Sequence, residues 1–481
     1  MEKQLPVSVL EEFPQEKKEM TERLLQEELQ RDSHKIIVLD DDPTGVQTVH
    51  DVSVYTDWSE ESIRNGFLEK EKLFYILTNS RSFSAEKTEK VHREIAERTA
   101  RVSKELGRDY LIISRGDSTL RGHYPLETET IRKVTEECLK VSFDGEIICP
   151  YFREGGRFTI GDVHYVKMGE RLVPAGQTEF AKDRTFGYHS SNLKDYIEEK
   201  SGGAVKARDV VSVSLDELRN TELDGIYEKL MKTHGFQKVI VNASDDWDLR
   251  VFSIALYRAM RSGKRFLFRT AASIVKVMGG ISDMPLLDRE KLSRVHQGEK
   301  NGGMVLVGSH TSKTTNQLKE LEKLPGLHFM EINTDLVLKE GALEAEIDRL
   351  LPICDGLIRE GRTVVAYTKR TLLEVAGDTE EEALARSAKI SDAVQSLAGR
   401  LTAPPAFVVA KGGITSSDVG TKALKVKRAR VMGQICPGIP VWETGEESTF
   451  PGIPYVIFPG NVGERETLLE AVEKLTEPGK R

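Results

Sequence analysis

Three consecutive carboxylates lie in the sequence DDDPTG at residues 40–45. The apolar run before them, residues 36–39, is long enough for one buried strand. Carboxylates at the carboxyl end of such a strand lie where open α/β sheets bind their ligands. Because like charges this close repel one another, we expect a compensating cation, proton or hydroxyl donor nearby. A single aspartate before Pro or Gly often only caps a turn, but three in a row favour a functional site.

More charged and hydroxyl side chains gather in loops that follow the next expected strands. Arginine binds a carboxylate through two parallel hydrogen bonds, and aspartate accepts hydrogen bonds from sugar hydroxyls. One arginine alone is more often part of a surface ion pair, but four in such loops favour a pocket for an anionic ligand, and the mixture suits a small polyhydroxy acid. The residues are the acids Asp40, Asp41, Asp42 and Asp117, the hydroxyls Ser80, Ser82, Ser118 and Thr119, and the arginines Arg81, Arg115, Arg121 and Arg157.

Three glycine-containing loops follow expected strands in the second half, at residues 308–311, 412–416 and 459–463. Glycine lets backbone N–H groups approach an anion closely, and a helix that starts after the loop favours phosphate. No Walker A sequence is present, because Ser309 stands where its lysine would be, and no G-x-G-x-x-G fingerprint occurs. Each loop alone could be a tight turn, but three in one domain indicate a site for nucleotide phosphates.

The elements that position these loops alternate between strand and helix, as in a parallel α/β sheet. The fold class we predict is therefore α/β, with two α/β domains whose sheets are mainly parallel. A charged helical lead-in at 1–34 precedes a first domain at 35–285, and a second domain follows at 300–478. Residues 155–205 are expected to form an insertion or a hairpin region. The expected strands are 36–39, 72–77, 110–114, 146–149, 209–213, 238–242, 265–268, 304–307, 328–332, 363–367, 406–410 and 455–458, and the clearest helices are about 85–106 and 125–139.

Composition narrows the class of protein. The chain has 481 residues, 39% hydrophobic and 30% charged, which is typical of a globular protein of two or three domains. A net charge of −8 argues against a general nucleic-acid or membrane binder. No apolar run reaches membrane-spanning length, the N-terminus lacks a secretory h-region, and the four cysteines have no zinc spacing. We expect a cytoplasmic protein in a reducing compartment, with no nucleic-acid or membrane partner.

At these motifs the chain resembles the four-carbon acid sugar kinase family, over roughly residues 35–465. The family's DD-x-TG motif matches residues 41–45, its T-x-SR loop matches 78–81, and its most specific element, DSTLRG, matches 117–122. Its PAFP-x-x-GR and T-x-F-x-x-D stretches are similar to residues 150–157 and 178–183. Its GS-x-S, GG-x-T and SGN-x-G loops resemble the three glycine loops. Departures such as His123 for Asn and Arg153 for Pro touch the substrate loops, so an oxidised or branched sugar acid competes with the usual four-carbon substrate.

The resemblance implies an N-terminal domain that binds a sugar acid (a tetronate or 3-oxo-tetronate) and a C-terminal domain that binds ATP, with Mg²⁺ at the phosphates. It leaves open the metal ligands, which aspartate acts as the base, which hydroxyl is phosphorylated, and whether the protein forms a homo-oligomer. The residues implied are catalytic Asp41, Asp42 and Asp117, substrate-binding Thr44, Arg81, Ser118, Arg121 and Arg157, and ATP-binding Ser309, Thr311, Gly412, Gly413, Ile414, Thr415, Gly460, Asn461 and Gly463.

Two alternatives remain at this point. Residues 40–44 also fit the D-x-D-x-T motif of haloacid-dehalogenase-type phosphatases, in which Asp40 would attack a phosphate covalently. That alternative leaves the DSTLRG loop and the second domain unexplained. The other alternative is a sensor that binds a sugar acid and a nucleotide without any chemistry.

Overall fold

The computed structural model describes residues 2–10, 12–295, 301–371, 373, 375, 377–460 and 462–476. Contacts within the chain divide it into two compact units. Unit 1 comprises residues 1–48 and 57–283, and unit 2 comprises residues 49–56 and 284–481. The chain therefore leaves unit 1 after Thr48, adds one short segment to unit 2, and returns before its last passage at residue 284.

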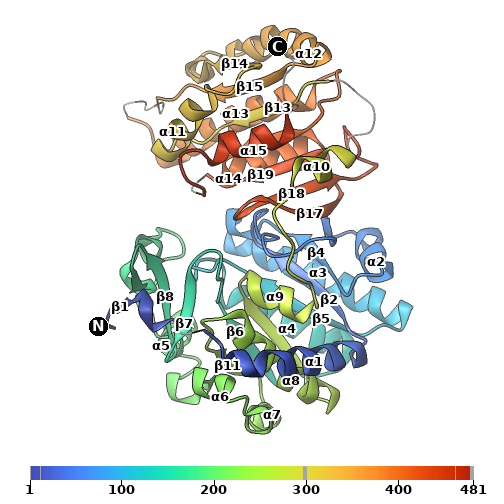
Figure 1. Cartoon of the computed structure of the whole chain (residues 1–481), viewed down its shortest axis with the longest axis vertical. Helices are drawn as coiled ribbons and strands as arrows, with labels where there is room; N and C mark the ends of the chain where they lie inside the picture. The colour runs from blue at the N-terminus through green and yellow to red at the C-terminus, as the bar shows by residue number, and fades with distance from the viewer. Residues whose placement is uncertain are drawn as a thin grey trace. The chain divides into compact units, whose positions relative to one another are not determined.

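Unit 1 is built on a sheet with strand order β10-β11-β6-β12-β5-β2-β4 (Figure 1). Neighbouring strands in this order pair in parallel, so their carboxyl ends lie along one edge. Strand β2, KIIVLD, is buried along its whole length, as expected for a strand with helices on both faces. The strands are β2 (Lys35–Asp40), β4 (Leu73–Leu77), β5 (Tyr110–Arg115), β6 (Gly145–Cys149), β10 (Val211–Val213), β11 (Gln237–Val241) and β12 (Phe266–Thr270).

The helices of unit 1 form two groups by their mutual contacts. One group packs around α8, which lies beside α1 (Figure 1), and the other joins α2, α3 and α4. Local sequence explains where α3 begins and ends, because Ser84 accepts a hydrogen bond from the Lys87 amide and Gly107 adopts the left-handed conformation. The helices are α1 (Gln15–Arg31), α2 (Glu60–Leu68), α3 (Ala85–Leu106), α4 (Leu126–Leu139), α5 (Leu193–Lys200), α6 (Leu215–Arg219), α7 (Leu223–Lys232), α8 (Asp246–Arg261) and α9 (Ala272–Met278).

The expected insertion contributes three strands to a small antiparallel sheet of order β1-β9-β8-β7, whose first strand comes from the N-terminal segment; the lead-in at 1–34 is therefore helical only in part, over α1. Its strands are β1 (Leu5–Pro6), β7 (Arg157–Ile160), β8 (Val163–Met168) and β9 (Arg171–Pro174). His164 of β8 is fully buried, and its Nε2 donates a hydrogen bond to the Ser118 carbonyl at 2.8 Å. Burial lowers the pKa of His164 to about 4, so it is a neutral structural residue at pH 7. The insertion thereby supports the DSTLRG loop.

The sheet of unit 2 has the order β3-β17-β18-β19-β16-β13-β15-β14. Strands from β19 to β14 pair in parallel, and β3, β17 and β18 pair antiparallel. Strand β3 belongs to the segment 49–56, which the sequence pattern does not separate from unit 1. The strands are β3 (Ser53–Tyr55), β13 (Met304–Val307), β14 (Leu327–Ile332), β15 (Thr363–Thr368), β16 (Val408–Lys411), β17 (Arg428–Cys436), β18 (Ile439–Thr444) and β19 (Pro454–Phe458).

Helices α11 and α15 bury apolar side chains against this sheet, where Leu321 and Leu468 are fully buried. Helix α13 packs between α12 and α14. The helices of unit 2 are α10 (Arg289–Val295), α11 (Ser312–Leu321), α12 (Ala342–Arg359), α13 (Glu380–Gly399), α14 (Gly413–Asp418), which continues as a π-helical turn (Val419–Ala423), and α15 (Thr467–Leu475).

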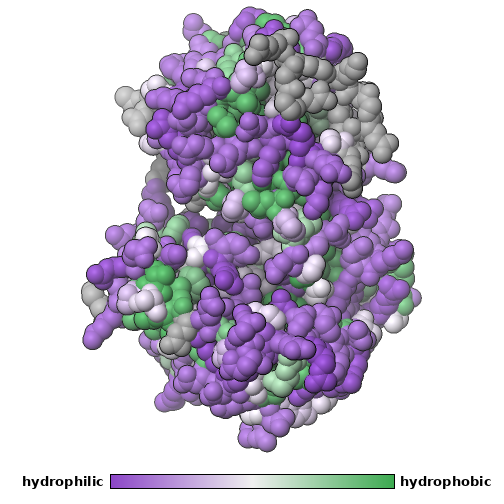
Figure 2. All heavy atoms as spheres, viewed as in Figure 1, coloured by the Kyte–Doolittle hydropathy of each residue, from purple (hydrophilic) through white to green (hydrophobic). Residues whose placement is uncertain are grey.

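The predicted fold class is confirmed, and each expected strand agrees with an observed strand to within two residues at either end. Among the described residues, no helix is both long and apolar enough to cross a membrane. Hydrophilic side chains cover most of the face shown in Figure 2.

Candidate functional site

The acidic loop at residues 40–45 lies at the carboxyl end of β2, which pairs with β4 and β5. Asp41 is buried, and Arg81 binds both of its carboxylate oxygens: Nε donates to Oδ2 at 3.2 Å and Nη2 to Oδ1 at 2.5 Å. Arg81 Nη1 also donates to Asp42 Oδ2 at 3.4 Å. The loop after β4 therefore supplies the cation that offsets the repulsion between the carboxylates.

Asp40 is the last residue of β2, and its side chain lies beneath the other residues of the acidic loop. Its side chain is 2% exposed, and Arg115 Nη1 lies 3.1 Å from its Oδ1. Burial raises the pKa of Asp40 to about 7, with Arg115 opposing the shift and the other two aspartates adding to it. A Cβ atom on Gly45 would come within 2.0 Å of Asp40 Oδ2, so glycine is needed to cover this carboxyl group. The arrangement keeps Asp40 away from solvent.

Asp42 is the most exposed of the three carboxylates, at 24% against 3% for Asp41. Its Oδ1 accepts hydrogen bonds from the Thr44 amide, at 2.8 Å, and from the Thr44 hydroxyl. Burial alone would raise the pKa of Asp42, but Arg81 and Thr44 outweigh it and hold that pKa below the ordinary value. Asp42 is therefore an ionised acceptor in a fixed orientation.

The DSTLRG loop after β5 holds a second partly exposed carboxylate, Asp117. It accepts hydrogen bonds from Arg121 Nε at 2.8 Å and from the Thr119 hydroxyl. Arg121 Nη1 also lies 3.6 Å from Asp183 Oδ2. Burial opposes ionisation of Asp117, yet Arg81 and Arg121 hold its pKa well below the usual range. Asp117 and Arg121 thus form a fixed ion pair.

Arg157 differs from the other arginines of this region. Its guanidinium group forms no ion pair or hydrogen bond with the described residues of the chain, and its Nε is buried without a partner. It lies 5.5 Å from the Phe180 ring centre, and Arg121 lies 5.2 Å from the same ring. Arg81, Arg115 and Arg121 each have a carboxylate partner in the structure. Of the predicted substrate-binding arginines, Arg157 is therefore the one without an ion pair to a described carboxylate.

A buried network that the sequence analysis did not identify supports these loops. Arg269 at the end of β12 pairs with Glu127 of α4, and Glu127 Oε1 accepts a hydrogen bond from Ser80 at 2.6 Å. A Cβ atom on Gly116 would lie 2.4 Å from Arg269 Cζ, so the start of the DSTLRG loop rests on this guanidinium. The sequence offered only their positions as a signal, because Arg269 lies near the end of a strand and Glu127 near the start of the helix after the motif.

In unit 2, the three glycine loops follow neighbouring parallel strands. Val307 of β13 is in register with Lys411 of β16, and Lys411 is in register with Phe458 of β19. The loops at 308–311 and 459–463 contact one another directly, since Thr311 Oγ1 donates to the Gly460 carbonyl at 3.5 Å. The structure therefore brings together the loops that the sequence indicated for phosphate binding.

Glycine is required at two positions in these loops, at one because space is short and at the other because of the backbone conformation. A Cβ atom on Gly308 would lie 2.1 Å from Thr415 Oγ1, and Gly412 has a φ of +129°, which favours glycine. Ser309 Oγ accepts a hydrogen bond from Thr314 Oγ1 at 3.0 Å, and Thr311 caps α11. These contacts fix the loop before α11.

The remaining predicted ATP residues are placed as follows. Gly413 faces open space, where a Cβ atom would have no neighbour within 4 Å. The Ile414 side chain is 67% exposed. Gly463 accepts a hydrogen bond from Lys313 Nζ at 3.1 Å through its carbonyl oxygen. Asn461 lies outside the described residues.

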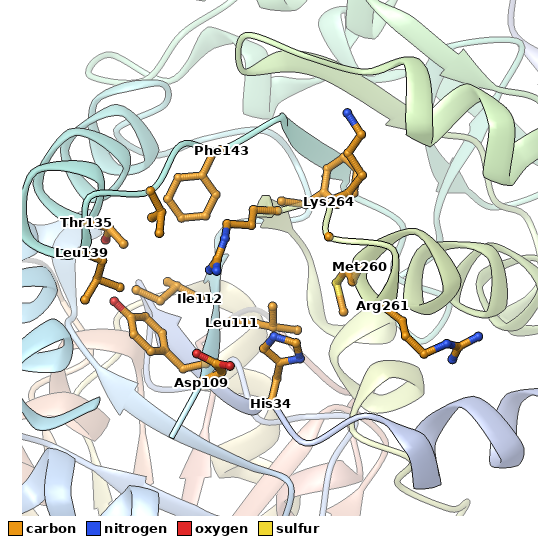
Figure 3. A pocket seen from close by; sticks show the side chains of 15 residues that line it. His34, Asp109, Leu111, Ile112, Thr135, Leu139, Phe143, Met260, Arg261 and Lys264 are labelled. Carbon is orange, nitrogen blue, oxygen red and sulfur yellow. The ribbon is translucent and has the colours of Figure 1, made fainter. Parts of the chain in front are cut away.

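Unit 1 also contains a cavity of about 290 Å³ at the amino ends of β5 and β12 (Figure 3). Its walls include Leu111, Ile112, Phe143 and Met260, with Lys264 at its edge. The acidic loop follows the carboxyl ends of the sheet, so this cavity lies at the opposite end of β5. It contains none of the predicted site residues.

Comparisons with known proteins also divide the chain into two domains, each with its own kind of ligand. Residues 36–278 match the model of a sugar-binding N-terminal domain, and residues 304–468 match that of a nucleotide-binding C-terminal domain. Haemophilus influenzae protein HI1011 is 17% identical with a TM-score of 0.60, covering 91% of this chain and 99% of its own. The putative tRNA synthase from Salmonella typhimurium LT2 is 16% identical with a TM-score of 0.64, covering 91% and 98%. These two likenesses show the fold alone. No curated protein matches the chain.

The chain thus has a sugar-binding domain followed by a nucleotide-binding domain. The two matches together cover most of the chain. It belongs to the four-carbon acid sugar kinase family, as its motifs indicated.

Proposed function

We propose that the protein is an ATP-dependent kinase that phosphorylates a hydroxyl group of a small sugar acid in carbohydrate catabolism. The acid is a tetronate, a 3-oxo-tetronate or a related oxo or branched sugar acid. The observation that carries the proposal is the uncompensated guanidinium group of Arg157 among arginines that are all paired. A partly buried charged group without an ion-pair partner favours an oppositely charged ligand.

In this proposal Arg157 binds the carboxylate of the sugar acid. A guanidinium group offers two parallel donors to a carboxylate, and the partly buried setting of Arg157 strengthens such a contact. Arg121, Thr44 and Ser118 line the same loops and bind or orient the rest of the substrate. Arg81 contributes by holding Asp41 and Asp42 in place, because both carboxylates contact its guanidinium group.

Asp42 is the residue we assign as the general base. It is ionised, oriented by Thr44 and more exposed than Asp41. A base must reach the proton that it removes, and Asp41 has both oxygens bound by Arg81. Asp117 is the alternative acceptor, but Arg121 and Thr119 already occupy one of its oxygens.

ATP would bind to unit 2 through Ser309, Thr311 and the glycine loops. Mg²⁺ would neutralise phosphate charge in such a reaction. Among the described residues no group of three or more His, Cys, Asp or Glu is arranged to hold a metal ion. We therefore propose that the ion is bound mainly by the nucleotide phosphates, as is common for Mg²⁺.

The experiment that tests the proposal measures ADP release by the purified protein with ATP, Mg²⁺ and a panel of sugar acids. Turnover with at least one tetronate-like acid is the expected result. Absence of turnover with every acid in the panel, by protein that still binds ADP, would favour the sensor and overturn the kinase.

The phosphatase alternative requires Asp40 to attack a phosphate. Its burial beneath Gly45 and its contact with Arg115 place no exposed nucleophile at that position. Phosphate release from phosphorylated sugar acids, abolished by Asp40→Asn, is the result that would revive this alternative.

A further inference from the structure

Lys411 is a buried cation that the kinase motifs do not include. It is the last residue of β16 and is fully buried. Its Nζ donates hydrogen bonds to the carbonyls of Pro459, at 2.6 Å, and Gly460, at 3.3 Å, and lies 4.0 Å from the Phe458 ring centre. No carboxylate of the described residues forms an ion pair with it.

Arg370 has a similar place on the other side of the same loops. It follows β15, and its Nη2 donates to the Ser309 carbonyl and, at 3.1 Å, to Thr315 Oγ1. Its Nη1 is buried and has no hydrogen-bond partner. Within the described part of the chain, Arg370 has no ion pair with a carboxylate. Two cations therefore lie beside the glycine loops without acidic partners.

Both cations donate hydrogen bonds to backbone carbonyls of the loops. These bonds determine the direction of the N–H group that follows each carbonyl. In a trans peptide unit the C=O and the following N–H point in opposite directions. Since the carbonyls of Pro459 and Ser309 face Lys411 and Arg370, the N–H groups of Gly460 and His310 point away from these cations. Neither N–H donates to an acceptor among the described residues.

We propose that Lys411 and Arg370 are positioning residues that build the phosphate site of unit 2. They turn N–H groups of the glycine loops toward the nucleotide phosphates and supply positive charge that is not held in an ion pair with any described carboxylate. Amides without an acceptor beside cations without an ion pair are the chemistry that recognises a polyphosphate. The inference rests on the proposed function in so far as the ligand is ATP.

An anion bound in these loops is expected to change the protonation of Lys411. Burial, and to a lesser degree Lys313 of α11, lowers the pKa of Lys411 to about 7. Lys313 is the charged group of the described residues that faces it. A bound phosphate would favour the protonated lysine, so binding near pH 7.5 is expected to draw a proton from the buffer.

The first test is calorimetric binding of tripolyphosphate, ADP and adenosine to the full chain and to Lys411→Met and Arg370→Gln. Both variants are expected to bind tripolyphosphate and ADP at least about tenfold more weakly, with adenosine affinity unchanged. Matched controls are Lys474→Met, whose Nζ also donates to a carbonyl, that of Ile435, and Arg359→Gln, which donates to the Thr402 hydroxyl. Unchanged tripolyphosphate affinity, or an equal loss of adenosine affinity, would overturn the proposal.

The second test separates charge from packing. Methionine fills nearly the same space as the lysine stem, so Lys411→Met is expected to remain folded. ADP binding at pH 7.5 is measured in buffers of different ionisation enthalpy, and wild type should take up a larger fraction of a proton than Lys411→Met. Equal uptake by the two proteins contradicts the role of Lys411. Wild-type protein that binds tripolyphosphate and ADP but phosphorylates no sugar acid would overturn the kinase function and leave this inference standing.

Discussion

The guanidinium group of Arg81 binds both carboxylate oxygens of Asp41, at 3.2 and 2.5 Å, and extends to Asp42 at 3.4 Å. This contact divides the acidic motif by role. Asp41 is buried, and Arg81 binds both of its carboxylate oxygens. The Asp42 side chain, in contrast, is partly exposed. Asp40 is buried against Arg115, so only one carboxylate of the three is available to a ligand.

Removal of Arg81 should destabilise the protein. Arg81→Met removes the two close contacts of the buried Asp41 and leaves it with more distant cations, of which Arg115 lies at 3.7 Å. Loss of one partner of a buried ion pair costs about 3–5 kcal/mol, and urea unfolding measures the change. The double variant Arg81→Met/Asp41→Asn should recover part of the stability, because position 41 then buries no unpaired charge. Equal destabilisation of the single and double variants would show that the pair is not coupled.

Substitution of the proposed base should affect turnover and not binding. Asp42→Asn keeps the shape of the side chain and is expected to lower kcat by about 10²- to 10⁴-fold, as for loss of a general base. ATP affinity should stay the same, since the phosphate loops lie in the other unit. Asp195→Asn, an exposed position in α5, is the control. Turnover by Asp42→Asn within a factor of about two of wild type would transfer the role to Asp117.

Arg157 should determine selectivity for acids. Arg157→Met is expected to raise KM for the sugar acid by about tenfold or more, because a hydrogen bond to a charged group contributes about 1.5–3 kcal/mol. Activity with the corresponding polyol, which lacks the carboxylate, is expected to be low in wild type and unchanged in the variant. Arg208→Met, at a highly exposed arginine of the same unit outside the substrate loops, serves as control. If Arg157→Met reduced activity equally with acid and polyol, a role in carboxylate binding would be excluded.

Lys411 should make stability depend on pH. Its folded pKa, about 7, lies below the ordinary value for lysine, so the unfolded chain binds more protons above pH 7. The contribution of Lys411 to unfolding free energy is therefore greatest above pH 10 and is lost as pH falls through 7. Lys411→Met should gain stability relative to wild type at pH 6 and lose that advantage by pH 10. A difference that is constant across this range in urea unfolding would contradict the shift.

Much of the fold follows from local signals in the sequence. Apolar runs such as 36–39 and 304–307 are strands because both faces of a parallel sheet are covered, and they end where the polar loops begin. Strand β3 was missed because the segment 49–56 pairs with β17, far away in the chain. No local pattern encodes such a partner.

The candidate site was predictable only in part. Motif positions indicated Asp42, Arg157 and the glycine loops, but not which arginines are paired. The pairing depends on distant residues, as when Arg269 of β12 meets Glu127 of α4. Lys411 and Arg370 were overlooked because a lysine or arginine after a strand has no distinctive sequence signal. The burial of Lys411, and the lack of an ion pair at either cation among the described residues, emerge only in three dimensions.

The most direct test of the central claim is ³¹P NMR of the products formed by the full chain from ATP and Mg²⁺ with a tetronate, and separately with the tetritol of the same stereochemistry. The account predicts ADP and a phosphorylated sugar acid from the tetronate, with little or no phosphorylated product from the tetritol. Phosphorylation of both compounds at equal rates, or of no sugar acid at all, would contradict it.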